Sequence, residues 1–111
     1  MSDETLNQEI NSIKDIDSAT DFELKHTPNV QVEEGEGGLV LKVSMGLKGI
    51  THPQVEEHYI EWYKVYDGDE MIAEQLFTAA DEPTATFEVP KGENLAVRSL
   101  CNLHGIWEAK V

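Results

Sequence analysis

The sequence predicts an all-β protein, an antiparallel β-sandwich of about seven short strands preceded by a short acidic arm. Apolar and polar residues alternate with a period of two from Leu39 to Met45, which is the pattern of a half-buried strand. Further runs rich in branched and aromatic residues follow, separated by turn-forming segments. No regular alternation of strands with helices occurs, so a parallel α/β fold is not expected.

The expected strands follow one another along the chain. A short extended piece lies near residues 30–32, and the alternating run ends at Gly46. The later strands are expected at residues 59–66, 71–78, 84–89, 94–100 and 106–111. Turn signals separate several of them, namely Asp67-Gly68-Asp69, Asp81-Glu82-Pro83 and Pro90-Lys91-Gly92. Each of these three segments predicts a hairpin.

Residues 1–21 form the acidic arm, and residues 22–111 form the sandwich domain. Four apolar residues of the arm lie at spacings that fit one narrow helical stripe: Leu6, Ile10, Ile13 and Ile16. Polar residues that favour turns and caps interrupt this stripe. We therefore expect an arm that is loosely docked or partly helical.

Composition limits the class of partner. The 111 residues are enough for one domain, and 8 basic against 22 acidic residues give a net charge of −14. This charge repels phosphate groups, so neither nucleic acid nor an anionic membrane is expected as a partner. The single cysteine excludes an intramolecular disulfide and fits a reducing compartment, which we expect to be the cytoplasm. No apolar run approaches the length of a membrane helix.

The four histidines and the only cysteine fall outside the clearest strands, at His26, His52, His58, Cys101 and His104. Imidazole and thiolate groups are common ligands of transition metals, and loops on a rigid β scaffold can converge. Taken singly, a loop histidine is most often a surface residue, and a free cysteine is most often a small buried apolar residue. Taken together, the five donors predict a metal site.

The residue types leave several metals open. Structural zinc takes four ligands, so it leaves one of the five donors unused. Blue copper requires two histidines, one cysteine and usually a later methionine, and no methionine follows Cys101. Four imidazoles in a plane with one thiolate beneath them suit iron with one open position. A pure electron carrier and a metal-free interaction module are the alternatives to an enzyme.

Three segments together resemble the superoxide reductases of the one-iron neelaredoxin type, in the desulfoferrodoxin iron-binding family. They are Lys25-His26-Thr27-Pro28, the run from His52 to Trp62, and Cys101-Asn102-Leu103-His104-Gly105-Ile106-Trp107. The resemblance covers residues 22–111 and implies an immunoglobulin-like β-sandwich. It also implies one iron per chain, with the four histidines as equatorial ligands and Cys101 as the axial ligand.

The resemblance further implies the reaction, a one-electron reduction of superoxide to hydrogen peroxide without release of dioxygen. Lys25 would attract the anionic substrate, and a rubredoxin-like or other small redox protein would return the electron. Superoxide dismutation is the alternative reaction for the same centre. Relatives of this type commonly assemble as homodimers or homotetramers.

Many relatives carry a glutamate directly before the motif lysine, where it binds ferric iron. Leu24 occupies that position here, and Glu23 lies one residue earlier. In an extended segment Glu23 would point to the other side, so water or hydroxide is expected at that ferric position. Three further residues are candidates for supporting the ligand loops. Pro53 would preset the turn of its loop, and Asn102 would stabilise the turn that holds Cys101. The backbone N–H of Leu103 would donate a hydrogen bond to the sulfur.

Overall fold

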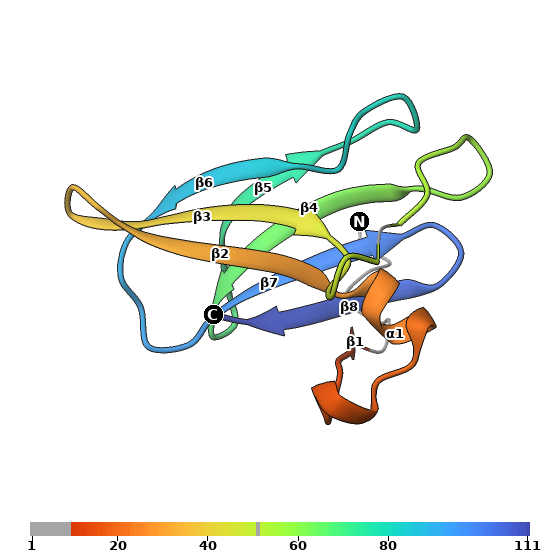
Figure 1. Cartoon of the computed structure of the whole chain (residues 1–111). Coiled ribbons are helices and arrows are strands. Elements are labelled where there is room, and N and C mark those ends of the chain that lie inside the picture. The colour runs from red at the N-terminus through yellow and green to blue at the C-terminus, as the bar shows by residue number, and fades with distance from the viewer. Residues whose placement is uncertain (1–9, 51) are drawn as a thin grey trace.

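Two β-sheets pack face to face in this computed structural model, which describes residues 10–50 and 52–111 (Figure 1). The larger sheet has the strand order β1-β8-β7-β4-β5, and the smaller has the order β2-β3-β6. The elements are β1 (Ile10–Asn11), the 3-10 helix η2 (Ile16–Ser18), α1 (Asp21–His26), β2 (Pro28–Gly35), β3 (Gly38–Met45), β4 (Ile60–Asp67), β5 (Glu70–Leu76), β6 (Ala85–Val89), β7 (Leu95–Cys101) and β8 (Gly105–Lys110). Neither helix in the described ranges is long and apolar enough to cross a bilayer.

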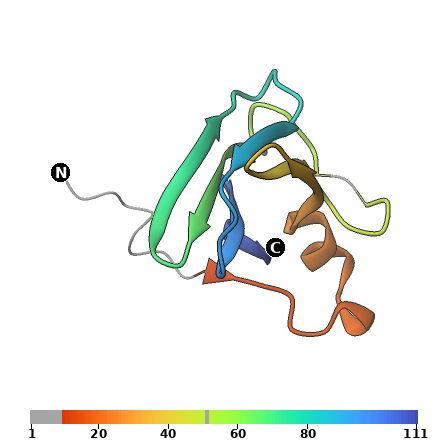
Figure 2. The same cartoon turned by 90° about the vertical axis from the view of Figure 1, so that its left-hand side faces the viewer.

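Every expected strand is present, so the predicted sandwich is confirmed. β2 runs for eight residues, whereas the sequence predicted only a short piece within it. All strand pairs are antiparallel except β1 with β8, which pair in parallel at Ile10 and Ile106. Figure 2 shows the two sheets end-on, enclosing a common interior.

The core fills the space between the sheets. Its largest cluster combines residues from both of them: Leu41, Val43, Met45, Ile60, Tyr63, Val65, Phe87, Val89, Leu95, Val97 and Cys101. Alternation on β3 places Leu41 inside and Lys42 outside.

The register of β4 against β7 shifts between Ile60 and Trp62, and such an irregularity changes the direction of the side chains beside it. Ile60 and Tyr63 consequently both lie in the core although they are an odd number of residues apart.

Two of the three predicted hairpins are wrong. The segment at Gly68 does join the antiparallel neighbours β4 and β5, and Gly68 adopts a positive φ of 61° that suits this tight turn. The segments 81–83 and 90–92 instead lead from β5 to β6 and from β6 to β7, which belong to different sheets. Turn-forming residues reverse the chain direction, but they do not determine which sheet receives the next strand.

The arm contains more structure than its composition predicted. Ile10 lies in β1, so the stripe from Ile10 to Ile16 is not one helix, and Leu6 lies outside the described residues. The Asn11 side chain donates a hydrogen bond to the Ile106 carbonyl at 3.1 Å. α1 begins at Asp21, one residue before the expected start of the sandwich domain. The division at residues 21 and 22 stays a prediction.

We expect Leu41→Ala to lower the free energy of unfolding by about 2–5 kcal/mol, because it leaves a cavity at a fully buried site. Lys42→Ala on the same strand is the matched control. Lys42 forms an exposed ion pair with Glu33 at 3.2 Å, which contributes less than about 1 kcal/mol. Urea unfolding of the two variants measures both values. Equal losses would contradict the assignment of the two faces of β3.

Candidate metal centre

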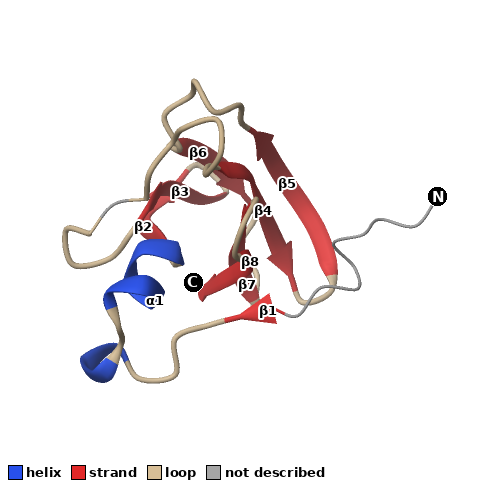
Figure 3. Cartoon of the chain, turned by 90° about the vertical axis from the view of Figure 1, so that its right-hand side faces the viewer, coloured by secondary structure: helices blue, strands red, loops and turns tan. Residues whose placement is uncertain are grey.

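One end of the sandwich gathers α1 and the loops β3–β4 and β7–β8, which carry all four histidines and the cysteine. Figure 3 views the molecule toward this end. β7 ends at Cys101, which lies on the inner face of its sheet as part of the core cluster. The strand therefore delivers the thiol into the interior at the point where the loops meet.

His26 is the last residue of α1. Thr20 caps the helix with its hydroxyl, which accepts from the Glu23 N–H at 3.1 Å, and the Glu23 carboxylate in turn accepts from the Thr20 N–H. The helix ends before Pro28, because a residue that precedes proline disfavours the helical conformation. The His26 ring is fully buried, and its Nδ1 lies 2.7 Å from the Phe22 carbonyl, one turn earlier.

The β3–β4 loop carries His52 and His58. His52 Nδ1 lies 2.6 Å from the carbonyl of Pro53, so this proline supplies the oxygen that orients the ring. Val55 and His58 exchange two backbone hydrogen bonds of 3.1 and 3.0 Å, which fold the loop into a tight turn. Gln54 accepts from the Ile60 N–H at 3.0 Å and thereby closes the loop onto β4.

The β7–β8 turn carries Cys101 and His104. Gly105 has a φ of 82°, which L side chains rarely adopt, and this conformation allows the chain to reverse within a few residues. Trp107 Nε1 donates to the His104 carbonyl at 3.1 Å. Burial raises the pKa of the Cys101 thiol, while hydrogen bonds from the backbone N–H groups of Leu103 and His104 act in the opposite direction.

Three imidazoles and the thiol converge. One ligand atom from each of His26, His52, His58 and Cys101 lies within 4.8 Å of all the others. The Nε2 atoms of the three histidines are buried and have no hydrogen-bond partner among residues 10–50 and 52–111. Since Nδ1 of His26 and of His52 each faces a carbonyl oxygen, that nitrogen carries the proton and Nε2 keeps a free lone pair. Orphaned lone pairs facing a common centre fit a metal ion.

His104 completes a cycle of rings although it is exposed. Ring centroids are 4.7 Å apart for His26 and His52, and 4.5 Å apart for His52 and His58. They are 5.1 Å apart for His58 and His104, and 4.8 Å apart for His104 and His26. Each pair of neighbours is nearly perpendicular, with interplanar angles of 74–81°. His26 and His58, which lie across the cycle, are 5.9 Å apart and tilted by 30°.

The electrostatics of the cluster favour neutral imidazoles. The pKa values of His26 and of His52 are lowered to about 4, mainly by burial and to a smaller extent by the neighbouring imidazoles, while the hydrogen bonds to the backbone carbonyls act in the opposite direction. Burial, together with His104, also lowers the pKa of His58. The charge of Lys25 on α1 contributes to all three decreases and lowers the pKa of the Cys101 thiol as well. Lys25 therefore imposes a positive potential on the whole cluster.

Glu23 lies in a helix and not in the extended segment predicted from the sequence, because residues 21–26 form α1. Its carboxylate accepts hydrogen bonds from the Thr20 N–H at 2.9 Å and from the Thr20 hydroxyl at 3.2 Å. Leu24 is buried in the protein, and its carbonyl accepts from the Leu47 N–H at 3.0 Å. Glu23 thus caps the helix, and Leu24 anchors it to the β3–β4 loop.

Two aromatic residues contact the ligand histidines, and these contacts were not predicted from the sequence. Phe22 lies 4.4 Å from the His26 ring and 4.9 Å from the His104 ring, between centroids. Trp107 stacks on His26 at 5.6 Å and 29°. The pattern Thr20-x-x-Glu23 is a capping-box signal for α1, and a helix there places Phe22 one turn before His26.

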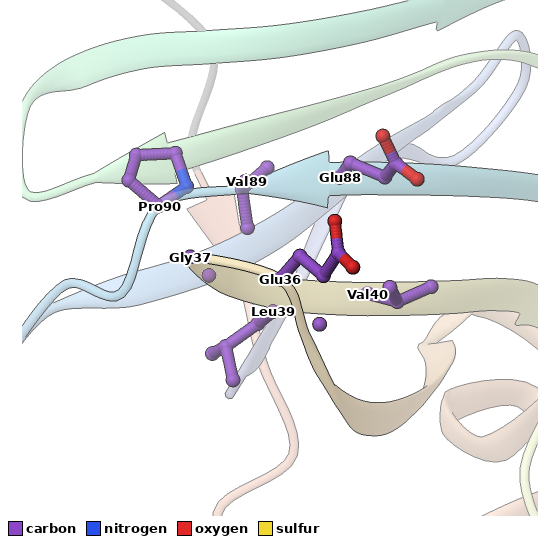
Figure 4. Close-up of a pocket in the computed structure, with 9 residues that line it drawn as sticks. Glu36, Gly37, Leu39, Val40, Glu88, Val89 and Pro90 are labelled. Atoms are coloured by element: carbon purple, nitrogen blue, oxygen red, sulfur yellow. The ribbon is translucent and has the colours of Figure 1, made fainter.

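The opposite end of the sandwich holds a separate hollow, shown in Figure 4. The β2–β3 turn and β6 form it, and its lining includes Glu36, Leu39, Glu88 and Pro90. Its lining contains neither histidine nor cysteine. The nitrogen and sulfur donors of the described residues are therefore concentrated at the other end.

Comparison with known proteins yields one family. The family model described as Desulfoferrodoxin matches residues 18–110. A putative superoxide reductase of Methanocaldococcus jannaschii is 35% identical over 108 residues, covering 89% of this chain and 88% of the relative. The superoxide reductase of Pyrococcus abyssi is 36% identical over 100 residues, covering 78% and 85% of the two chains.

A solved structure is also similar, the superoxide reductase (neelaredoxin) from Ignicoccus hospitalis. It superposes with a TM-score of 0.69 at 26% identity, covering 92% of this chain and 91% of that one. The family match spans nearly the whole described chain, including α1, both sheets and all three ligand-bearing segments. The chain belongs to the desulfoferrodoxin family.

Proposed function

We propose that this protein reduces superoxide by one electron to hydrogen peroxide at a mononuclear non-haem iron site. The observation that carries the proposal is the closed cycle of four imidazole rings, with the Cys101 sulfur among the ligand atoms of His26, His52 and His58. Relatives and solved structures of similar sequence carry the name superoxide reductase, which supports the same activity.

The donor set fits iron better than the alternatives. His26, His52, His58 and His104 would hold the ion from four sides, and Cys101 would hold it as a thiolate. Tetrahedral zinc uses only four donors and would leave one of these rings without a role. When bound, iron would supply the single electron that superoxide accepts, and a rubredoxin-like or other small redox protein would replace that electron.

The ligand residues prepare the site for this ion. Their lowered pKa values keep His26, His52 and His58 neutral near pH 7, so the ring nitrogens bind without competition from protons. The backbone N–H groups of Leu103 and His104 stabilise negative charge on the Cys101 sulfur. Cys101 would bind the ion as a thiolate and would increase the electron density on it, which is the influence that a cysteine ligand exerts in haem enzymes.

Lys25 attracts and orients the substrate. The net charge of −14 repels an anion at long range, but salt screens that field beyond about 8 Å. Within that distance the local charge decides, and the field of Lys25 reaches the buried His26 and His52, the half-buried His58 and Cys101. The ammonium group is therefore suited to hold superoxide beside the rings and to stabilise negative charge on the product.

No carboxylate is expected at the open position. Glu23 is engaged in capping α1, and the side chain of Leu24 has no donor atom.

We also expect the protein to act in the cytoplasm, where a lone thiol stays reduced, and to assemble as a dimer or tetramer.

Purified oxidised protein should contain about one iron per chain and show a sulfur-to-iron charge-transfer band in the visible spectrum. Cys101→Ser should abolish the band, because an oxygen ligand lacks the thiolate orbital. Val97→Ala, at a fully buried position on the same strand, is the control and should keep it. Elemental analysis and absorption spectra measure both. Zinc or copper in place of iron, or an unchanged band in Cys101→Ser, would contradict the proposal.

Metal-free protein should keep two imidazoles neutral at pH 5, because the pKa values of His26 and His52 are about 4 when folded and 6.5 when unfolded. As the pH falls from about 6.5 to 4, the unfolded chain binds protons that the folded chain does not, so these groups reduce stability over that window. Titration of the imidazole resonances by NMR measures the pKa values, with protein unfolded in urea as reference. Four transitions near 6.5 in the folded protein would count against this site.

Lys25→Gln should lower the second-order rate constant for superoxide about 10- to 100-fold, because a nearby cation raises the local concentration of an anion. Lys91→Gln makes the same change of net charge next to Glu34, at the end occupied by the β2–β3 turn, and should leave the rate unchanged. Pulse radiolysis at several salt concentrations measures both variants. Similar rates for the two would assign the effect to net charge and not to position.

A further inference from the structure

Asn102 connects the two loops that carry His58 and Cys101. Its Oδ1 accepts a hydrogen bond from the Tyr59 N–H at 2.9 Å, and its Nδ2 donates to the Glu57 carbonyl at 3.0 Å. Its own backbone N–H donates to the Tyr59 carbonyl at 3.1 Å. Both residues that flank His58 are therefore bound to the residue that directly follows Cys101.

The three histidines with a buried Nε2 atom differ in whether a hydrogen bond orients the ring, and the bonds of Asn102 compensate for this difference. His26 and His52 each have an Nδ1 within 2.7 Å of a carbonyl oxygen, which orients the ring. No such hydrogen bond orients the His58 ring within residues 10–50 and 52–111, and its buried Nε2 is also without a partner. The orientation of His58 thus depends on its backbone, which Asn102 holds on both sides.

The side chain of Asn102 spans from the β7–β8 turn to the β3–β4 loop. Its hydrogen bonds therefore do more than stabilise the turn in which it lies. The backbone bond from Asn102 to Tyr59 extends the pairing of β4 with β7 past its last partners, Ile60 and Cys101. The two side-chain bonds add a crosslink where regular pairing ends. The two side-chain bonds and the backbone bond of Asn102 together hold the backbone around His58 against the end of β7.

We propose that Asn102 is a positioning residue that fixes His58 relative to Cys101 and thereby controls how firmly the site retains its metal. This inference rests on the proposed iron site. Groups that orient metal ligands from outside typically change metal affinity 10- to 100-fold when they are replaced. A residue that only stabilised the β7–β8 turn would alter unfolding without altering the geometry around the sulfur.

The test compares Asn102→Ala with Gln54→Ala. Gln54 is a matched control because its side-chain amide also anchors the β3–β4 loop, to which it belongs. The amide accepts from the Ile60 N–H at 3.0 Å and donates to the Ile60 carbonyl at 3.2 Å and to the Thr78 carbonyl at 3.3 Å. Among the described residues, its side chain forms no hydrogen bond with the β7–β8 turn. Iron-loaded proteins are mixed with an excess of a ferrous chelator, and the rate of iron release, the charge-transfer band and urea unfolding are recorded.

We expect Asn102→Ala to release iron 10- to 100-fold faster than the wild type and to shift the charge-transfer band. Asn102→Asp keeps the acceptor for the Tyr59 N–H but loses the donor to the Glu57 carbonyl, so its rate of iron release should lie between those of the wild type and Asn102→Ala. Gln54→Ala should lose stability while keeping the wild-type band and release rate. If Asn102→Ala does not fold, Asn102→Asp decides, and a wild-type release rate for it overturns the inference.

Two further outcomes overturn the inference alone. One is that iron-loaded Asn102→Ala matches the wild type in release rate and band, which leaves the proposed function intact. The other is that Gln54→Ala matches Asn102→Ala in both measurements, which assigns the effect to loop stability in general. Wild-type protein that binds no iron at all overturns the proposed function together with this inference, and so separates the two failures.

Discussion

The hydrogen bonds from imidazole Nδ1 atoms to backbone carbonyls are the interactions on which the rest of this site depends. They fix the proton on one nitrogen of His26 and of His52, and they leave the other nitrogen as a free lone pair that faces the centre of the cluster. A buried polar atom without a partner costs about 1–3 kcal/mol. The three buried Nε2 atoms therefore lower the stability of the fold, and a bound cation would remove this unfavourable contribution to the free energy.

The environment of these rings combines apolar walls with a local positive charge. Trp107 and Phe22 pack against the His26 ring. Lys25 lies between Phe22 and His26 in the sequence of α1 and adds a positive contribution to the potential at His26, in a molecule whose net charge is strongly negative. Attraction of a small anion is thereby confined to a short distance from the cluster, where the surrounding protein weakens the screening.

The strands and the donor residues were accessible from the sequence, whereas the geometry that joins them was not. The alternation at Leu39–Met45 specifies β3 because one face of that strand must be buried. The turns near Pro83 and Pro90 gave no information on sheet exchange, since the same residues serve a hairpin and a crossover. α1 was missed because six residues are too short for a periodic pattern, although Thr20 and Glu23 carried its capping signal. The resemblance indicated the five donors, but the perpendicular cycle of rings depends on helix and loop geometry that no spacing encodes.

The donors come from both ends of the chain, since α1 precedes every long strand and Cys101 ends the penultimate one. No local segment contains a complete coordination sphere. During synthesis, the N-terminal histidine leaves the ribosome long before the thiol does, and the two meet only when β7 joins β4. Metallation is therefore a late event in biogenesis that follows closure of the sandwich, and an emerging chain offers no finished site to a competing cation.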